Sequence, residues 1–206
     1  MIGDQIMISD IGIVILAAGG STRFGEPKQL LRVDGDSLLR RAIEIAMSSG
    51  CARVVVVLGP DSSEMMDEID DLAACPVVNP DWETGISSSI LCGVNKMLEF
   101  DAELAAVVFM LCDQPGVTTG TISALIDGYR STRKPIVACE YDTTPGVPAL
   151  FARELFPALR LLKGDTGAKV VIRERLSDVL VIRRPEVFVD IDSPEDYLKL
   201  LESKQQ

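Results

Sequence analysis

Residues 11–31, IGIVILAAGGSTRFGEPKQLL, combine an apolar run with a glycine-rich turn and two cations. Residues 11–16 are almost all β-branched or aliphatic and carry no charge, which predicts a strand buried on both faces, as in a parallel sheet. Gly19 and Gly20 follow and allow a ligand to approach the backbone closely. The same turn carries two hydroxyls and two positive charges, on Ser21, Thr22, Arg23 and Lys28. Exposed amides, hydroxyls and fixed positive charge together suit the oxygens of a polyphosphate.

Two well-known phosphate loops do not fit this turn. A Walker A loop needs a lysine directly after its last glycine, whereas Glu26 and Pro27 follow Gly25. The dinucleotide motif G-x-G-x-x-G needs a spacing that Gly19, Gly20 and Gly25 do not have. The simplest alternative is an ordinary turn between a strand and a helix that happens to contain glycine. Because that alternative leaves two cations and two hydroxyls in one short loop unexplained, we expect a phosphate-binding turn.

Strand and helix patterns alternate along the rest of the chain. Further strands are expected where short apolar runs end at turn residues: 54–58, 76–78, 104–112, 135–139, 179–182 and 187–189. Helical patterns are expected between Ser37 and Gly50, at 64–71, 87–98 and 118–130, after residue 169 and from Pro194 onward. This order predicts an α/β fold, a three-layer α/β/α sandwich with a Rossmann-like, mainly parallel sheet and one antiparallel insertion in the second half. A length of 206 residues favours a single domain over residues 1–206.

Three consecutive serines begin the helical pattern that starts near residue 87. Ser87, Ser88 and Ser89 follow Gly85, and their amides and hydroxyls at a helix N-terminus are expected to be unpaired and open to an anion or a nucleobase edge. Simple N-capping is the alternative, but one serine would suffice for it. Trp82, the only tryptophan, is expected either to flank this site or to pack on its rim.

Asp113 is the best candidate for a metal ligand. It follows the most hydrophobic strand pattern, and a carboxylate at the carboxyl end of a central parallel strand lies at the mouth of the α/β crevice. Pro115 cannot continue the strand, so the chain turns there and leaves Asp113 at the rim. A lone aspartate after a strand is more commonly a turn former or a helix cap.

Asp190 and Asp192 form a second pair of carboxylates. They are two positions apart, so in an extended chain they point the same way, and one cation could be held by both. Capping is the alternative, because Asp192 and Ser193 precede a helix with Pro194 at its first position. Capping of this helix does not explain why a second carboxylate, Asp190, lies two positions before Asp192.

Composition restricts the chemistry further. A formal net charge of −11 makes the surface repel nucleic acid, and it would repel a nucleoside triphosphate as well unless local cations or a divalent metal offset it. No histidine is present, so imidazole catalysis and histidine ligation of a metal are excluded. Phosphoryl transfer by positioning and metal needs no histidine.

The five cysteines are odd in number and show no C-x-x-C spacing, which speaks against a disulfide framework and a metal site. Cys112 and Cys139, at the ends of apolar runs, are expected to be small buried hydrophobes. Residues 1–10 lack a signal-peptide pattern and no apolar window is long enough for a membrane span, so we expect a cytoplasmic protein without a membrane partner.

These motifs resemble those of the MobA-like nucleotidyltransferases, which modify the molybdenum cofactor or sugars. The family signature L-A-A/G-G-x-S-x-R-x-G-x-x-K-x-L is matched by Leu16, Ala17, Gly19, Ser21, Arg23, Gly25, Lys28 and Leu30. Later segments are similar too and follow in the same order: G-x-S-S-S at 85–89, C-D-Q-P at 112–115, G-x-P-x-L-F at 146–151, G-D-x-G-A at 164–168 and D-x-D-S-P-E-D at 190–196. Ala18 resembles the cytidylyltransferases, since guanylyl-transferring relatives usually carry glycine there.

The resemblance implies a fold of the nucleotide-diphospho-sugar transferase type and a defined activity. A nucleoside monophosphate, CMP from CTP in the first place, would pass to a phosphate-bearing acceptor such as molybdopterin, with release of pyrophosphate. Mg²⁺ is the implied cofactor, held by Asp113 and by Asp192 first or Asp190 second. Arg23, Lys28 and Asp113 are the implied catalytic residues. The implied nucleotide-binding residues are Leu16, Ala17, Ala18, Gly19, Gly20, Ser21, Thr22, Ser87, Ser88 and Ser89.

The resemblance also implies a transient contact with a molybdoenzyme or its chaperone, and it leaves the acceptor open. Val147 stands where many cofactor-modifying members have histidine or asparagine. A nucleotidyltransferase acting on a sugar phosphate or another small acceptor, and a non-catalytic module that binds a cofactor, are the alternatives.

Overall fold

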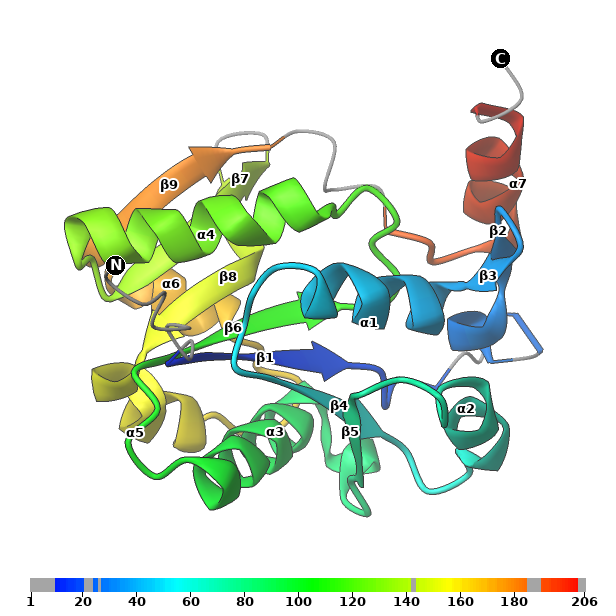
Figure 1. Ribbon diagram of the computed structural model, residues 1–206, viewed down its shortest axis with the longest axis horizontal. Helices are drawn as coiled ribbons and strands as arrows, with labels where there is room; N and C mark the ends of the chain where they lie inside the picture. The colour runs from blue at the N-terminus through cyan, green and yellow to red at the C-terminus, as the bar shows by residue number, and fades with distance from the viewer. Residues whose placement is uncertain (1–9, 21–23, 26, 142–143, 185–189, 204–206) are drawn as a thin grey trace, which may run out of the picture.

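The computed structural model describes residues 10–20, 24–25, 27–141, 144–184 and 190–203. Ser21, Thr22 and Arg23 of the glycine-rich turn lie outside the described residues, as does the strand expected at 187–189. Within the described ranges the chain forms helices on both sides of a large sheet (Figure 1).

The large sheet has seven strands in the order β5-β4-β1-β6-β8-β7-β9. The strands are β1 (Ile11–Leu16), β4 (Arg53–Leu58), β5 (Cys75–Val78), β6 (Ala106–Leu111), β7 (Ile136–Tyr141), β8 (Thr144–Ala152) and β9 (Val179–Arg183). Strands β5, β4, β1 and β6 are parallel, β8 runs antiparallel to both of its neighbours, and β7 pairs with β9 in parallel. The expected mainly parallel sheet with an antiparallel element in the second half is confirmed. β2 (Arg32–Val33) and β3 (Asp36–Ser37) form a separate small hairpin.

Strand β1 lies in the middle of the parallel part, and all of its residues are buried. Ile13 and Ile15 point into one core cluster, whereas Val14 and Leu16 belong to the cluster on the opposite face. A strand covered on both faces needs apolar residues at every position, which explains why its sequence shows no polar alternation.

Helices cover both faces of the sheet and make three layers (Figure 1). The face of Ile13 is covered by α1 (Leu38–Met47), α2 (Ser63–Glu68) and α4 (Thr119–Thr132). The face of Val14 is covered by α3 (Ile86–Phe100), α5 (Phe156–Arg160) and α6 (Lys169–Glu174). α7 (Pro194–Ser203) joins a smaller cluster with Leu31, Val33, Leu38 and Ile191. The predicted α/β/α sandwich is confirmed.

Two helices differ from the expectation. The helix expected at 64–71 ends at Glu68, and α5 was not expected at all. α5 is only five residues long, too short for a helical period to show in the sequence, and its buried residues Phe156 and Leu159 fix it by packing on α3.

The cysteines are in the state that the sequence predicts. All five cysteines are free thiols, and Cys112 and Cys139 are buried as expected. Burial and the neighbouring Asp113 carboxylate raise the pKa of the Cys112 thiol.

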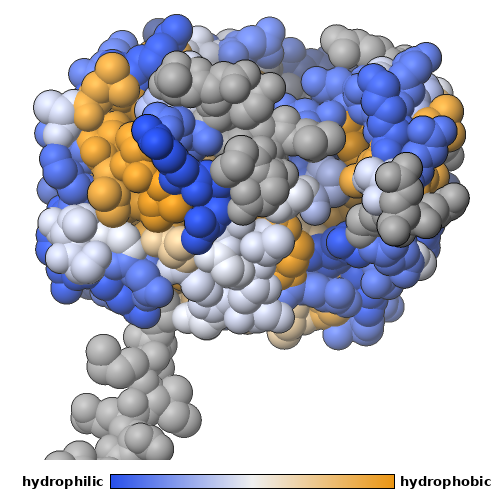
Figure 2. Space-filling model, turned by 90° about the horizontal axis from the view of Figure 1, so that it is seen from above, coloured by the Kyte–Doolittle hydropathy of each residue, from blue (hydrophilic) through white to orange (hydrophobic). Residues whose placement is uncertain are grey.

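Figure 2 shows one face of the molecule, on which hydrophilic residues dominate and hydrophobic residues reach the surface in separate patches. In the described part of the chain, no helix has both the length and the apolarity to cross a bilayer.

Helix α3, which carries the three serines, lies unusually close to the sheet at Gly93. A Cβ atom added there would lie 2.4 Å from Val14 Cγ1 and 3.3 Å from Val57 Cγ2. A contact of 2.4 Å does not occur between real side chains, so glycine sets the distance between α3 and the centre of the sheet.

We expect Gly93→Ala to lower the free energy of unfolding by about 1–3 kcal/mol, because overpacking forces α3 or Val14 to move. In a thermal melt this corresponds to a fall in Tm of roughly 2–12 °C for a chain of this size. Gly120→Ala is the matched control: Gly120 is exposed in α4, and its added Cβ would make only an ordinary contact with Thr118. It should leave Tm unchanged or raise it. Equal Tm values for the two variants would show that a methyl group fits between α3 and the sheet at Gly93.

Candidate active site

The carboxyl ends of β1 and β6 bring two of the sequence motifs together. The strands are adjacent and parallel, with Leu16 opposite Leu111, so the glycine turn after β1 and Asp113 after β6 emerge side by side. This edge of a parallel sheet is the usual ligand position in α/β folds.

Lys28 is the centre of the resulting charge cluster. Its ammonium donates a hydrogen bond to Asp113 Oδ2 and lies 3.5 Å from Asp192 Oδ1. It also lies 3.5 Å from the carbonyl oxygen of Ile191. The backbone closes the same arrangement, because the amide of Ile191 donates to the carbonyl of Asp113 at 3.0 Å. Three residues selected from separate motifs of the sequence thus meet at one point.

The charges in this cluster depend on each other. Burial works against the charged form of Lys28, but Asp113 and Asp192 outweigh it and hold the pKa of the ammonium above its ordinary value. Asp190 behaves differently: burial is the largest effect and raises the pKa of its carboxyl group, although a hydrogen bond from Gln114 opposes it. The ammonium of Lys28 therefore offsets the charge of neighbouring carboxylates at the end of β6.

Gln114 connects Asp190 to this cluster and was not selected from the sequence. Its side chain is buried, and its Nε2 donates to Asp190 Oδ1 at 3.0 Å. The signal that could have found it is its place directly after Asp113, since the residue following a metal-ligand candidate shares its surroundings.

The residues in this cluster fit a divalent cation. Asp113 Oδ1 is buried and has no hydrogen-bond partner, so it has a lone pair directed at no donor. Within the described ranges, three or more acidic or thiol side chains nowhere converge into a ready-made cation site. Mg²⁺ commonly takes one or two carboxylates from the protein and its other ligands from water and substrate phosphates, and this pattern agrees with both observations.

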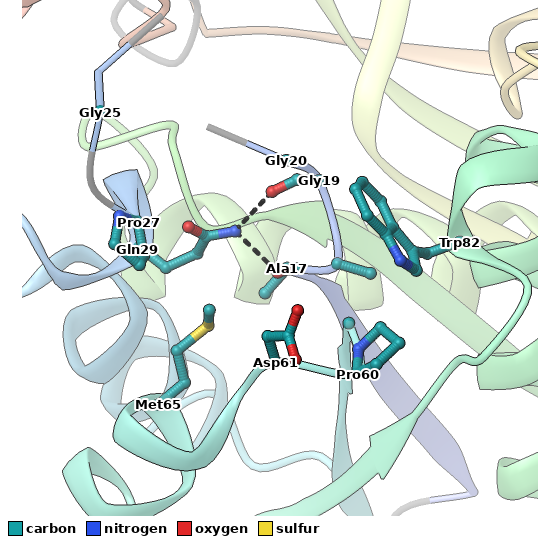
Figure 3. Close-up of a pocket in the computed structure, with 12 residues that line it drawn as sticks. Ala17, Gly19, Gly20, Gly25, Pro27, Gln29, Pro60, Asp61, Met65 and Trp82 are labelled. Atoms are coloured by element: carbon teal, nitrogen blue, oxygen red, sulfur yellow. Dashed lines mark hydrogen bonds between the residues drawn. The ribbon is translucent and has the colours of Figure 1, made fainter. Parts of the chain in front are cut away.

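A cavity of about 390 Å³, the glycine-turn cavity, lies between the turn after β1 and the loop after β4 (Figure 3). Its walls include Ala17, Ala18, Gly19, Gly20 and Trp82. Trp82 therefore lines the cavity and does not merely pack outside it.

Gln29 holds the glycine turn in place and was also not selected from the sequence. The side chain is buried, and its Nε2 donates to the carbonyl oxygens of Ala17 at 2.8 Å and Gly19 at 2.9 Å (Figure 3). Both carbonyls thus accept hydrogen bonds from one side chain, which holds the backbone at the start of the glycine turn in place.

The prediction of unpaired serine amides is wrong for Ser87 and Ser88. The amide of Ser87 donates to the carbonyl of Gly164 and that of Ser88 donates to Gly85. The reason is tertiary: the loop at residues 164–165 packs directly on Gly85, where a Cβ atom would lie 2.2 Å from the carbonyl carbon of Gly164. Only glycine, here with φ of 111°, permits this approach.

The hydroxyls of Ser88 and Ser89 also have partners. Asn79 Nδ2 donates to Ser88 Oγ at 2.8 Å and to Ser89 Oγ at 3.0 Å. Of the three serines, Ser89 lines a cavity with Lys28 and Asp113, which we call the Lys28 cavity and whose volume is about 390 Å³.

A third cavity, the α6 cavity, has a volume of about 530 Å³ and lies beside α6 and β8. Val147, Asp165 and Ala168, from the family-like segments at 146–151 and 164–168, line it. The Lys28 cavity shares Ala17, Ala18, Gly19, Gly20, Gln29 and Trp82 with the glycine-turn cavity, and it shares Leu16, Ile86, Leu111 and Asp165 with the α6 cavity. The charge cluster thus lies between two hollows that can hold different molecules.

Comparison with known proteins agrees with this geometry. The model of the family described as "MobA-like NTP transferase domain" matches residues 13–179 of this chain. Nicotine blue oxidoreductase of Paenarthrobacter nicotinovorans is 32% identical over 91% of this chain and 95% of its own length. A probable molybdenum cofactor guanylyltransferase of Bacillus cereus strain Q1 is 22% identical over 90% and 93%. The crystal structure of Rv0371c of Mycobacterium tuberculosis H37Rv in complex with manganese is 29% identical, covers 94% of this chain and 98% of its own, and superposes with a TM-score of 0.77.

The strand order and the three layers define an α/β fold. Solved structures of nucleotidyltransferases have the same fold. With a match over residues 13–179, the chain belongs to the MobA-like NTP transferase family. The resemblance inferred from the glycine-rich turn is therefore confirmed. The names of the relatives differ in the chemistry they state, so family membership alone does not fix the nucleotide or the acceptor.

We expect Lys28→Met to destabilise the protein by about 2 kcal/mol, because the buried carboxylate of Asp113 loses a charged hydrogen-bond partner. Millimolar Mn²⁺ should then raise the Tm of this variant more than that of the unmodified protein, since a cation replaces the missing ammonium. The measurement is a thermal melt with and without Mn²⁺.

Lys96→Met is the matched control, because Lys96 pairs with Glu99 on the exposed side of α3. A surface pair of this kind contributes at most about 1 kcal/mol. An identical response to Mn²⁺ in Lys28→Met and Lys96→Met would mean that Asp113 and Asp192 do not form the cation site.

Proposed function

We propose that the protein is a Mg²⁺-dependent nucleotidyltransferase that moves CMP from CTP onto a phosphate-bearing acceptor such as molybdopterin and releases pyrophosphate. The observation that carries the proposal is the cluster of Lys28, Asp113 and Asp192 between two cavities. One cavity can hold the nucleotide and the other the acceptor, so that the reacting phosphates meet at the cluster.

The glycine turn is the proposed site of the triphosphate. Among the described residues, no atom lies within 4 Å of a Cβ added at Gly19, which leaves space for a ligand on that side of the turn. Lys28 supplies a donor and a positive charge from one side, and Arg23, which lies outside the described residues, is proposed to supply another. Local cations of this kind offset the repulsion expected from a net charge of −11.

The proposed position of the base is the glycine-turn cavity beside Trp82 and Ala18. Ala18 is 8% exposed and lines this cavity and the Lys28 cavity. Compared with glycine, its methyl group narrows the hollow, which favours the single ring of cytosine over a purine. The guanylyl transfer stated for a relative is the competing outcome.

The reaction needs no protein nucleophile. An oxygen of the acceptor phosphate attacks the α-phosphorus of CTP, the bond from this phosphorus to the bridging oxygen of the β-phosphate breaks, and pyrophosphate leaves. Asp113 and Asp192, with Asp190 in second place, are proposed to hold Mg²⁺, which supplies a Lewis acid at the transferred phosphate. The manganese complex of Rv0371c supports a divalent cation in this fold. Lys28 would stabilise the negative charge on the triphosphate.

The acceptor is the least constrained part of the proposal. Molybdopterin is favoured by the motifs at residues 112–115 and 190–196, and it agrees with the relative named as a molybdenum cofactor enzyme. A sugar phosphate or another small acceptor would use the same cluster. A non-catalytic cofactor-binding module would bind the nucleotide without releasing pyrophosphate.

The test is a pyrophosphate-release assay with CTP, GTP, ATP or UTP, Mg²⁺, and molybdopterin present or absent. We expect release with CTP above the other three nucleotides, and only with acceptor. Asp113→Asn should cut turnover by about a hundredfold or more, because it removes a carboxylate that the transition state requires. Asp127→Asn, on the exposed side of α4, is the matched control and should keep full activity.

Two results would reject parts of the proposal. Near-normal turnover in Asp113→Asn, with an unchanged Tm, would remove the carboxylate from the catalytic site. Nucleotide binding without pyrophosphate release, with every acceptor tried, would favour the non-catalytic module.

A further inference from the structure

Strand β9 forms one outer edge of the large sheet (Figure 1). It pairs with β7 on its inner side, and none of the residues that the structure describes pairs with its outer side. Every second residue of such an edge strand directs its N–H and C=O groups away from the sheet, where another chain can pair with them. The outer side of β9 therefore offers a row of backbone donors and acceptors.

The opposite edge of the sheet is protected. It is formed by β5, which is only four residues long and contains Pro76. A proline has no N–H group to donate, and short edge strands with proline are a means by which proteins prevent pairing with another chain. β9 contains no proline, and its central residues 180–182 are all apolar. The two edges thus differ in how readily they accept a further strand.

Helix α4 fixes β9 through one face. Leu180 and Ile182 pack on the core beneath α4, and a Cβ added to Gly128 of this helix would lie 2.8 Å from Leu180 Cδ2. Val181 alternates with them, so it points to the opposite face of the sheet, where it is 39% exposed. Because β9 is already ordered by this packing, a chain that pairs with its edge need not order it.

Positive charge is concentrated around β9. Residues 133–134 and 175–184 contain five Lys and Arg residues and one Asp, in a chain with a net charge of −11. The two segments meet before the strand begins, because Lys134 Nζ donates a hydrogen bond to the carbonyl oxygen of Ser177 at 2.6 Å. The protein is therefore acidic as a whole but basic along this edge.

Part of this positive charge is available to a partner. At the carboxyl end of β9, Arg183 pairs with Glu140 of β7 at 3.0 Å. Arg133 and Arg175, near the amino end, are exposed and pair with no carboxylate among the residues that the structure describes. Exposed guanidinium groups beside a row of backbone donors and acceptors are complementary to a strand that carries carboxylates.

Charge also decides between a different partner and a second copy of this chain. Two copies paired symmetrically through β9 would bring both sets of cations into one seam, where like charges repel. Nucleic acid would use the cations but would leave the backbone groups of the edge unpaired. An acidic segment in extended conformation uses both features.

We propose that the outer edge of β9 binds an extended, acidic segment of a partner protein, which adds to the sheet as a further strand and whose carboxylates contact Arg133 and Arg175. No residue of this edge lines the three cavities described above, so the inference does not depend on the proposed function.

The test measures binding of short, dye-labelled peptides to the full chain by fluorescence anisotropy. The probes are a peptide of alternating glutamate and valine, the same peptide with lysine for glutamate, and a peptide of alternating glutamate and proline, which keeps the charge but lacks every second N–H group. We expect the glutamate–valine peptide to bind at least about tenfold more tightly than the other two. The net charge of the protein alone predicts tighter binding of the lysine peptide, and that result would overturn the inference, as would equal binding of the two acidic peptides.

Hydrogen exchange locates the added strand. The glutamate–valine peptide should slow the exchange of amides in residues 179–183 and leave those of residues 75–78, in the other edge strand, unchanged. Binding without slower exchange in residues 179–183 would overturn the inference. A dimer that protects these amides without peptide would overturn it in favour of a second copy.

Charge variants test the role of the arginines. Arg175→Glu should weaken binding of the glutamate–valine peptide by about tenfold. Arg160→Glu is the matched control, because it changes the net charge equally and Arg160 is exposed on α5, where it contacts Asn95 of α3. An equal Kd in the two variants, with unchanged Tm, would overturn the inference. Tighter, Arg175-dependent binding of an oligothymidylate would overturn it in favour of nucleic acid.

Discussion

The contact of Lys28 with Asp113 and Asp192 is the interaction on which the rest of the structure depends. Each of these residues belongs to a different part of the chain: the loop after β1, the end of β6 and the segment before α7. Carboxylates gathered in a half-buried corner repel each other unless a cation lies between them. The ammonium provides that cation, and the backbone bond from Ile191 to Asp113 keeps the segments aligned. The fold can therefore assemble an acidic site inside an already acidic protein.

The same constraint explains why two hollows meet at this point. The parallel order of β1 and β6 leaves their carboxyl ends adjacent, so the glycine turn and Asp113 emerge side by side. The glycine turn opens towards the loop after β4, whereas β8 and α6 close the opposite side. The charge cluster thus lies between two hollows, each with its own wall, that can hold different molecules.

Much of the fold could be predicted because local hydrophobic patterns in the sequence determine its strands and helices. Strand β1 is apolar at nearly every position, and the alternation of strand and helix patterns along the chain predicts the three layers. A lone aspartate after a strand is more commonly a turn former, so Asp113 could be selected because its C-D-Q-P motif resembles that of the family. Asp190 and Asp192 could be selected because two carboxylates in an extended segment point the same way, and capping of the next helix does not explain Asp190. The charge cluster could thus be expected from the sequence, although its ammonium bridge could not.

The features that the sequence did not predict all depend on distant partners. The amide of Ser87 is occupied by the carbonyl of Gly164, a contact set by the loop before α6 and invisible in the helix pattern. Gln29 and Gln114 resemble surface residues in sequence, and only the fold buries them against Ala17 and Asp190. Helix α5 is too short to show a period and forms because α3 covers it.

A crystal structure with Mn²⁺ and a non-hydrolysable CTP analogue tests the central claim most directly, because the anomalous signal of manganese identifies the cation without assumption. We expect manganese in direct coordination by the carboxylates of Asp113 and Asp192, the triphosphate over Gly19 and Gly20, and the ammonium of Lys28 on a phosphate oxygen. Manganese bound away from Asp113, or a triphosphate that does not contact the glycine turn, would contradict it.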